Sequence, residues 1–213
     1  MNTLSSHSTT PAQAPGLDLA AILGPAAWAR LPPAVRRRFA AGHAATVYEG
    51  AMAFHCSSVG RCFAWLAGCL KSPLTPLCRA DVPVQVRVHG DGRGGVVWER
   101  HLGGPGARVH VVRSTKSLGP DGRVQERTDG GLSMALEVRE EEGALVFVSR
   151  RYFFAAGPLR IPVPSWLAPG TCRVEHRDLG AGRFAFTLEM RHPLWGLTFH
   201  QTGVFADPEE LSI

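Results

Sequence analysis

The sequence predicts a mainly β protein of the α+β class, built on a strongly bent antiparallel sheet or barrel of about eight to ten strands. Two observations predict it. From about residue 45 onward, polar and apolar side chains alternate with the period of two that is typical of β-strands. These strands are separated by short glycine-containing turns, which leave no room for crossover helices and favour antiparallel pairing. A calycin-like barrel fits this pattern best, and a helix-grip fold is the alternative.

The segment 183–192 shows the alternation most clearly. One face carries Phe184, Phe186, Leu188, Met190 and His192, and the other face is mainly polar. A sheet with one apolar and one solvated face must curve around a core. By the same criterion, the expected strands are 45–54, 82–89, 96–102, 108–116, 123–128, 132–140, 144–155, 171–178, 183–192 and 197–205.

The strand 144–155 departs from this rule because both of its faces are apolar and it contains Arg150 and Arg151. If the alternation holds, one of these arginines points into the barrel. We expect the strand to be covered on both sides. Tyr152, which follows directly, is a further polar group within this apolar stretch.

Two helical regions are expected. Residues 17–42 read as two short helices, the second with Pro33 in its first turn. Its basic run, 36–38, is either a phosphate-binding patch or a solvated helix face. Ser57 or Ser58 caps a helix over 59–70, whose apolar stripe places it near an opening of the barrel.

The segment 157–170 interrupts the strands with four prolines around Leu159, Ile161, Trp166 and Leu167. Proline cannot donate a ladder hydrogen bond, so we expect a loop and not a strand. Its apolar residues require burial. We therefore expect it to lie across the mouth of the barrel as a lid.

Composition limits the class of protein. The chain of 213 residues suits one domain, 17–213, preceded by a Ser/Thr/Ala/Pro-rich leader, 1–16, that we expect to be disordered. The net charge of +5 is spread along the strands, which argues against nucleic-acid binding. The most apolar stretch, 59–70, is too short to span a membrane, so we expect a cytoplasmic protein. Five cysteines without a CxxC pair predict reduced thiols, no metal site and no cofactor.

Several short segments, in their order along the chain, carry a resemblance to a known family. They are 74–88, 98–102, 114–116, 125–127, 157–162, 195–197 and 201–203. These segments closely resemble a bacterial domain family of unknown function. The resemblance covers nearly everything after Leu31. Members of this family are often found downstream of saccharopine-dehydrogenase-like or epimerase-like modules, and sometimes alone. The resemblance implies a recurring fold and a link to redox or biosynthetic partners, and it implies no known activity.

Trp98 and Arg100 share the apolar face of the strand 96–102. An arginine there is unusual because burying an unpaired charge is costly. It either pairs with Glu126 inside the barrel, or binds the carboxylate or phosphate of a ligand, or is exposed.

Two histidines near the end of the chain add to the candidates. His192 lies at a strand end before a proline and His200 lies in the last strand; histidine titrates near neutrality and is suited to ligand contact or acid–base work. For His192, a hydrogen-bonded residue at the barrel rim is the other interpretation. The predicted ligand-binding residues are thus Trp98, Arg100, Glu126, Arg151, Tyr152, His192 and His200, and no catalytic residue is identified.

Three functions are compatible with these features. The first is a noncatalytic module that binds an apolar or amphipathic small molecule, since barrels of this size either fill with side chains or hold one small ligand. The second is a biosynthetic cyclase or isomerase that uses the same cavity. The third is an interaction domain for an oxidoreductase. A pocket beside Trp98, Arg100, Glu126 and Tyr152 favours the first two, and a solid core with an exposed apolar patch favours the third.

Overall fold

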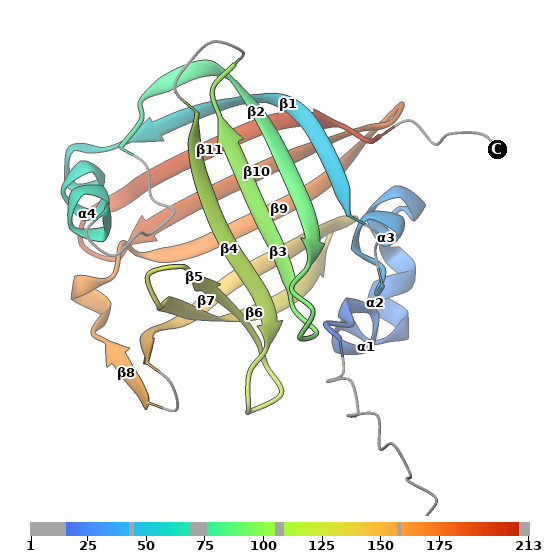
Figure 1. The fold of residues 1–213 in the computed structure, drawn as a ribbon, viewed down its shortest axis with the longest axis horizontal. Helices are drawn as coiled ribbons and strands as arrows, with labels where there is room; N and C mark the ends of the chain where they lie inside the picture. Colours follow the sequence, from blue (N-terminus) through green and yellow to red (C-terminus); the bar gives the residue numbers. More distant parts are fainter. Residues whose placement is uncertain (1–15, 43–44, 69–75, 105–108, 157–158, 209–213) are drawn as a thin grey trace, which may run out of the picture.

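The chain folds into a closed antiparallel β-barrel of ten strands with one additional strand (Figure 1). The computed structural model describes residues 16–42, 45–68, 76–104, 109–156 and 159–208. Strands β1 to β7 pair in sequence, β7 pairs with β9, and β1 closes the ring by pairing with β11. The predicted fold class is therefore confirmed. The helix-grip alternative is wrong, because the sheet closes on itself.

The strands agree with the expected segments to within a few residues at each end, apart from β8. They are β1 (Thr46–Cys56), β2 (Arg79–Gly90), β3 (Val96–Leu102), β4 (His110–Leu118), β5 (Val124–Thr128), β6 (Leu132–Glu141), β7 (Ala144–Ala156), β8 (Leu159–Val163), β9 (Thr171–Gly180), β10 (Arg183–His192) and β11 (Gly196–Ala206). Residues 1–15 of the expected leader lie outside the described residues.

Two apolar clusters fill much of the barrel. One includes Leu145 and Phe147 of β7, and the other includes Val84 and Val86 of β2. Trp98 packs against both clusters, so its indole lies where the two meet. The inward-facing residues are those that the alternation places on the apolar faces of the strands.

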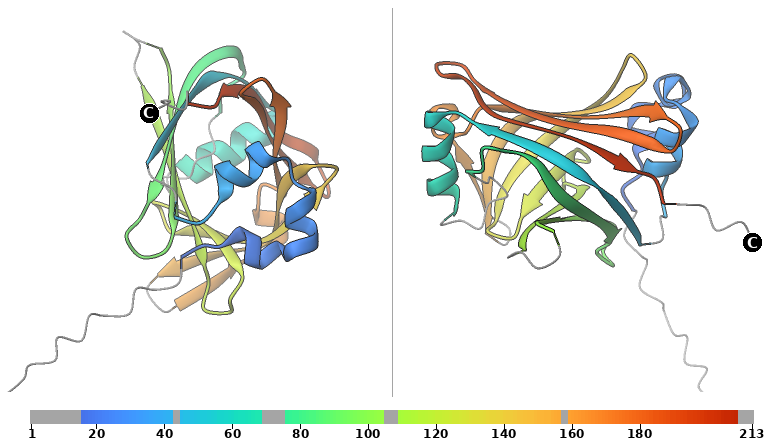
Figure 2. Two further views of the ribbon diagram at one scale, coloured as in Figure 1. Left: turned by 90° about the vertical axis from the view of Figure 1, so that its right-hand side faces the viewer. Right: turned by 90° about the horizontal axis from the view of Figure 1, so that it is seen from above.

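Three short helices, and not two, cover one end of the barrel: α1 (Leu19–Leu23), α2 (Pro25–Arg30) and α3 (Pro33–Phe39) (Figure 2). Asp18 caps α1 by accepting hydrogen bonds from the backbone N–H groups of Ala20 and Ala21. Pro25 and Pro33 each open a helix. A proline costs nothing there, because the first N–H of a helix has no partner within it. We call this the α3 end.

The helix α4 (Ser58–Gly68) lies at the opposite end, against β1 and β11 (Figure 2). Ser57 caps it, accepting a hydrogen bond of 3.0 Å from the backbone N–H of Gly60. Gly60 is required for this packing, since a Cβ there would lie 2.2 Å from the carbonyl oxygen of Thr198. The predicted helix beside a barrel opening is confirmed in its described part, and we call this the α4 end.

The inward arginine expected in β7 is absent because the strand contains a β-bulge. Leu136 of β6 pairs with Ser149, whereas Ala135 pairs with Arg151, so Arg150 is the extra residue. A bulge shifts the alternation by one residue. Arg150 therefore reaches Glu137 on the outer face, Arg151 is also exposed, and Tyr152 turns inward. The expectation that one arginine points into the barrel is wrong.

The proline-rich segment contains a strand that was not expected. β8 continues the edge of β7 beyond the part that pairs with β9, with Tyr152 opposite Val163. Its apolar side chains remain exposed, as does Trp166 at 63%. The expectation that the apolar residues of this segment are buried is thus wrong. The segment returns to the barrel at Gly170, where a Cβ would lie 2.4 Å from the backbone of Arg191.

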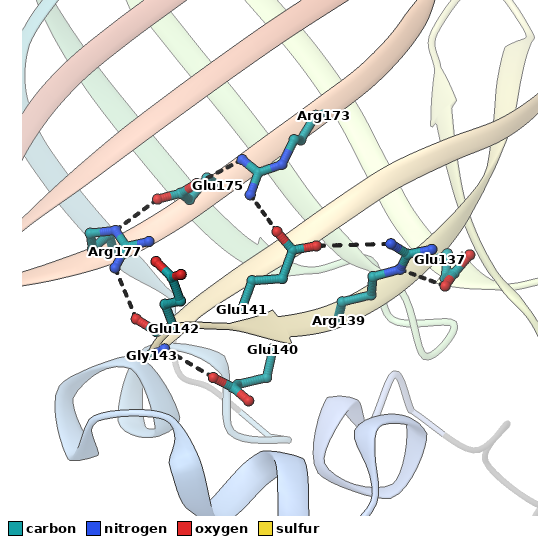
Figure 3. Close-up of polar contacts among 9 residues, drawn as sticks. All are labelled: Glu137, Arg139, Glu140, Glu141, Glu142, Gly143, Arg173, Glu175 and Arg177. Atoms are coloured by element: carbon teal, nitrogen blue, oxygen red, sulfur yellow. Dashed lines mark hydrogen bonds and ion pairs between the residues drawn. The ribbon is translucent and has the colours of Figure 1, made fainter.

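The arginines scattered along the strands mostly serve the outer face. Figure 3 shows a run of alternating charges that crosses from β6 to β9. Arg173 lies 2.7 Å from Glu141 and 2.6 Å from Glu175, which in turn lies 2.8 Å from Arg177. Val146 of β7, in register between these strands, is completely buried. The stems of the charged side chains shield it from water.

Candidate functional site

A polar cluster lies inside the barrel, within an otherwise apolar core. Its members, which we call the lumen cluster, come from β3, β4, β5, β9 and β11: Arg100, Ser114, Lys116, Glu126, His176 and Gln201. All six line one cavity of about 50 Å³. Buried polar groups are costly unless they are paired, so each of them requires a partner.

Lys116 and Glu126 form a buried ion pair. They are direct neighbours in the β4–β5 register, and their charged atoms lie 3.2 Å apart with each side chain only 9% exposed. Burial alone would raise the pKa of Glu126, but Lys116, a hydrogen bond from Ser114 and the charge of Arg100 together lower it. Glu126 is therefore ionised at neutral pH. Its charge is matched by Lys116.

Arg100 has no carboxylate of its own among the described residues. Its Nη1 donates a long hydrogen bond of 3.4 Å to the neutral Oε1 of Gln201, and its guanidinium lies 5.9 Å from the ring centre of Phe186. Burial lowers the pKa of Arg100, but an arginine stays protonated in proteins. The expected ion pair with Glu126 is not formed, because Lys116 occupies the carboxylate. Glu126 acts on Arg100 only at longer range.

His176 is buried among aromatic rings next to the same cavity. Its ring lies 4.9 Å from Phe39, 5.3 Å from Phe186 and 5.5 Å from Trp98. Burial, reinforced by the charges of Lys116, Arg38 and Arg100, holds its pKa well below the usual value. The ring is therefore neutral. Its Nδ1 has no hydrogen-bond partner among the described residues.

Tyr152 lies behind the cluster and is committed to the structure. Its hydroxyl donates a hydrogen bond of 2.9 Å to the carbonyl oxygen of Gly170. Burial raises the pKa of Tyr152 well above its usual value, and burial raises that of the neighbouring Cys172 to about 12. Both groups are neutral, so neither balances Arg100.

A second, larger cavity of about 270 Å³ lies at the α3 end. Its walls include Leu19, Phe39 and Val96, and it reaches the surface at the exposed Gly42 and Gly92. We call it the mouth cavity. Trp98 and Lys116 line both this cavity and the cavity of the lumen cluster, so the two cavities lie on either side of these side chains.

Arg38 of α3 borders the mouth cavity, yet it differs from Arg100. Its Nε and Nη2 donate to both carboxylate oxygens of Asp207 at 2.9 and 2.8 Å, and its guanidinium stacks 3.9 Å from the centre of Phe184. The side chain is only 1% exposed. The run 36–38 is thus not a uniformly solvated face, since Arg38 fastens α3 to the barrel.

The structure brings together four of the seven predicted site residues. Trp98, Arg100 and Glu126 line the lumen cavity, and Tyr152 points inward beside it. Arg151 is exposed on the outer face. His200 also faces outward, where its Nε2 lies 3.9 Å from Glu189.

His192 lies at the α4 end, away from the lumen cluster. It is 2% exposed and stacks on Trp195 with ring centres 4.1 Å apart, while Phe63 of α4 lies 5.9 Å away. Its Nδ1 accepts a hydrogen bond from the backbone N–H of Leu194. His192 therefore helps to attach α4 to the barrel.

Four residues of the cluster were not among the predicted site residues, namely Ser114, Lys116, His176 and Gln201, and two of these, Lys116 and His176, are titratable. Lys116 shares the face of Val112 and Ser114 in β4, and His176 shares the face of Val174 in β9. Their signal is the same as that of Arg100, a titratable residue at an apolar position of an alternating strand. Applied to every strand, that criterion would have found both.

The described residues contain neither a candidate metal site nor a helix that could span a membrane. No group of three or more His, Cys, Asp or Glu residues there is placed to hold a metal ion. No helix in the described part of the chain is long and apolar enough to cross a membrane.

A comparison with family models gives one match, over residues 31–205. A comparison with curated proteins gives none. The matched segment contains the whole lumen cluster and the described strands of the barrel, except for the last residue of β11. The chain therefore belongs to the family described as domain of unknown function DUF4166.

Proposed function

We propose that this domain binds an amphipathic small molecule inside the barrel. The observation that carries the proposal is that the mouth cavity adjoins the polar lumen cluster, with Trp98 and Lys116 lining both. Binding sites for small molecules are typically concave and mostly apolar, with a few polar groups that fix orientation. A ligand would place its apolar body against Phe39, Val96 and Trp98. Its polar end would reach the cluster.

The size of the cavity limits the ligand. About 270 Å³ lies just below the range usual for drug-sized ligands, and the lumen adds about 50 Å³. The barrel is therefore suited to one small molecule with a single polar end and not to a large cofactor. A matching test is native mass spectrometry of the protein purified from its own host, which should show one bound small molecule.

Access can be tested at the rim of the mouth cavity. Ala41 lines it and is exposed, so Ala41→Trp would place an indole over the opening without disturbing the core. We expect association of an added ligand to slow at least tenfold in stopped-flow fluorescence. Ala29→Trp is the control, because Ala29 of α2 is exposed and does not line the cavity. Equal association rates in both variants would contradict access at the α3 end.

A second candidate function, an interaction domain for an oxidoreductase, is favoured by a different observation. Large apolar side chains are exposed at the α4 end and along the neighbouring β8, and patches of this kind often mark protein contacts. They are Trp65, Leu66, Leu159, Ile161, Trp166, Leu167, Leu194 and Trp195.

This candidate is tested by sedimentation of the chain with a saccharopine-dehydrogenase-like protein from the same host. Trp166→Gln with Leu167→Gln should abolish a complex that the wild type forms. The same double variant should leave ligand binding in the barrel unchanged. No complex with the wild type would reject this candidate and leave the first one standing.

A further inference from the structure

We infer that the polar end of the bound molecule is a carboxylate, held by the guanidinium of Arg100 with Nδ1 of His176 as a second contact. This inference rests on the proposed function and names the chemical class of the ligand. It follows from the charges that face the lumen cavity, from the hydrogen bonds that those groups lack, and from the room beside them.

The charge inside the barrel is unbalanced. Among the described residues that line the lumen cavity, Arg100 and Lys116 are cationic and Glu126 is anionic. The thiol of Cys172 and the imidazole of His176 are neutral. One positive charge therefore has no counterpart. A buried charge that is not compensated is costly, so its retention points to a partner that arrives with a ligand.

Arg38 and Arg100 each line one of these cavities, and of the two only Arg100 lacks a carboxylate partner among the described residues. Arg38 is held by both oxygens of Asp207. Among the described residues, Arg100 donates a hydrogen bond only to the amide oxygen of Gln201, at 3.4 Å, and this leaves most of its five N–H donors available. A carboxylate matches the planar fork of a guanidinium and can accept two of these donors at once.

His176 supplies the second contact. It lines the same cavity as Arg100, and its Nδ1 is buried without a hydrogen-bond partner in the described part of the chain. A neutral imidazole carries one N–H, which can lie on Nδ1 and donate to an anion. A ligand carboxylate would thus accept hydrogen bonds from Arg100 and give Nδ1 of His176 the partner that it lacks among the described residues.

Charge favours a carboxylate over a phosphate. One unbalanced positive charge matches a monoanion. A phosphate monoester carries a charge of about −1.5 to −2 at neutral pH and three terminal oxygens. It would reverse the imbalance and not remove it.

The test uses three probes that share one alkyl chain: octanoate, octanamide and octyl phosphate. Isothermal titration calorimetry at neutral pH should show octanoate binding at least tenfold more tightly than octanamide. Octyl phosphate should bind more weakly than octanoate. Equal affinities for the acid and the amide would overturn the carboxylate while leaving the amphipathic ligand intact. Tighter binding of the phosphate would also overturn it, and no binding of any probe would reject the proposed function itself.

Variants of Arg100 test whether this arginine causes the preference for octanoate over octanamide. Arg100→Gln should reduce the preference for octanoate over octanamide to about one, while Arg100→Lys should retain part of it. Arg87→Gln is the matched control, since Arg87 of the adjacent strand β2 is exposed and bonded only to Gln85 among the described residues. A preference that survives Arg100→Gln would overturn the assignment.

A variant that should increase the preference for octanoate distinguishes the effect of charge from a loss of folding. Glu126→Gln removes the only carboxylate among the described residues that line the lumen cavity, and it should increase the preference for octanoate. A decrease would contradict the charge argument. Thermal melting of each variant with and without octanoate separates a loss of binding from a loss of structure.

Discussion

The two ends of the barrel differ in how they use tryptophan. At the α3 end, Trp28 and Trp98 pack against the larger apolar cluster, and Trp98 also lines the mouth cavity. At the α4 end and near β8, Trp65, Trp166 and Trp195 are largely exposed. The first end thus presents a recess with the buried Lys116 in its lining, and the second presents an apolar surface. A closed barrel can assign binding of a small molecule and contact with a partner to opposite ends.

The largest effect is expected at the α3 end. Phe39 is 7% exposed and contacts the rings of Trp98 and His176, so Phe39→Ala should cost about 3–5 kcal/mol of unfolding free energy in urea titration. The enlarged mouth cavity should shift ligand preference from octanoate toward decanoate. Phe63→Ala at the α4 end is the comparison and should leave that preference unchanged. The same shift in both variants would erase the distinction between the ends.

Two glycines of α4 provide the next test. Gly60→Ala should lower the free energy of unfolding by about 1–3 kcal/mol, because the new methyl group meets the backbone of Thr198. Gly68→Ala meets nothing within 4 Å and should be neutral or slightly stabilising. Chemical denaturation of the two variants measures how much the packing of α4 contributes to the free energy of unfolding. If Gly60→Ala were harmless, the close packing of α4 on β11 would be in doubt.

The pH dependence of stability should report the buried His176. Its pKa in the folded state lies well below 6.5, so the imidazole stays neutral there, whereas it takes up a proton in the unfolded chain below that pH. Lowering the pH from 6.5 toward 5 therefore favours unfolding by about 1.4 kcal/mol per pH unit. Above pH 6.5 this contribution is constant. His176→Gln should remove the slope, whereas Phe186→Leu, a neighbour without a titrating group, should retain it.

The smallest effect is expected on the outer face. Arg173→Gln breaks contacts with Glu141 and Glu175 but leaves no buried charge. We expect a loss of about 0.5–1 kcal/mol at low ionic strength that largely disappears at 1 M salt, where charges are screened within about 3 Å. Thermal melting at the two salt concentrations measures it. A loss that resists salt would mean that the shielding of Val146 depends on Arg173 itself.

Much of the fold could be predicted from the sequence because the alternation is a local signal. Each regular strand repeats it over several residues, and β10 matched its predicted bounds in full. The prediction failed where one residue changes the phase. The extra residue Arg150 reverses the direction of the side chains that follow, and a bulge leaves no fixed mark in the sequence.

The candidate site was predicted less completely. Trp98, Arg100 and Glu126 were placed in the interior by their position in single strands. The pairing of Arg100 with Glu126, one of the alternatives that the sequence left open, was wrong, because Lys116 lies opposite Glu126 once β4 and β5 are in register. That register depends on how the two strands pair, and it cannot be predicted from the sequence of either strand alone.

The sequence by itself determined that the chain forms an antiparallel barrel and that charged residues lie on its apolar faces. Both follow from the period of two, which is a property of neighbouring residues. Only the tertiary structure decided that Lys116 neutralises Glu126 and that Arg100 has no carboxylate partner among the residues that the structure describes. Whether a buried charge is compensated depends on distances of a few ångströms between strands that are remote in the chain.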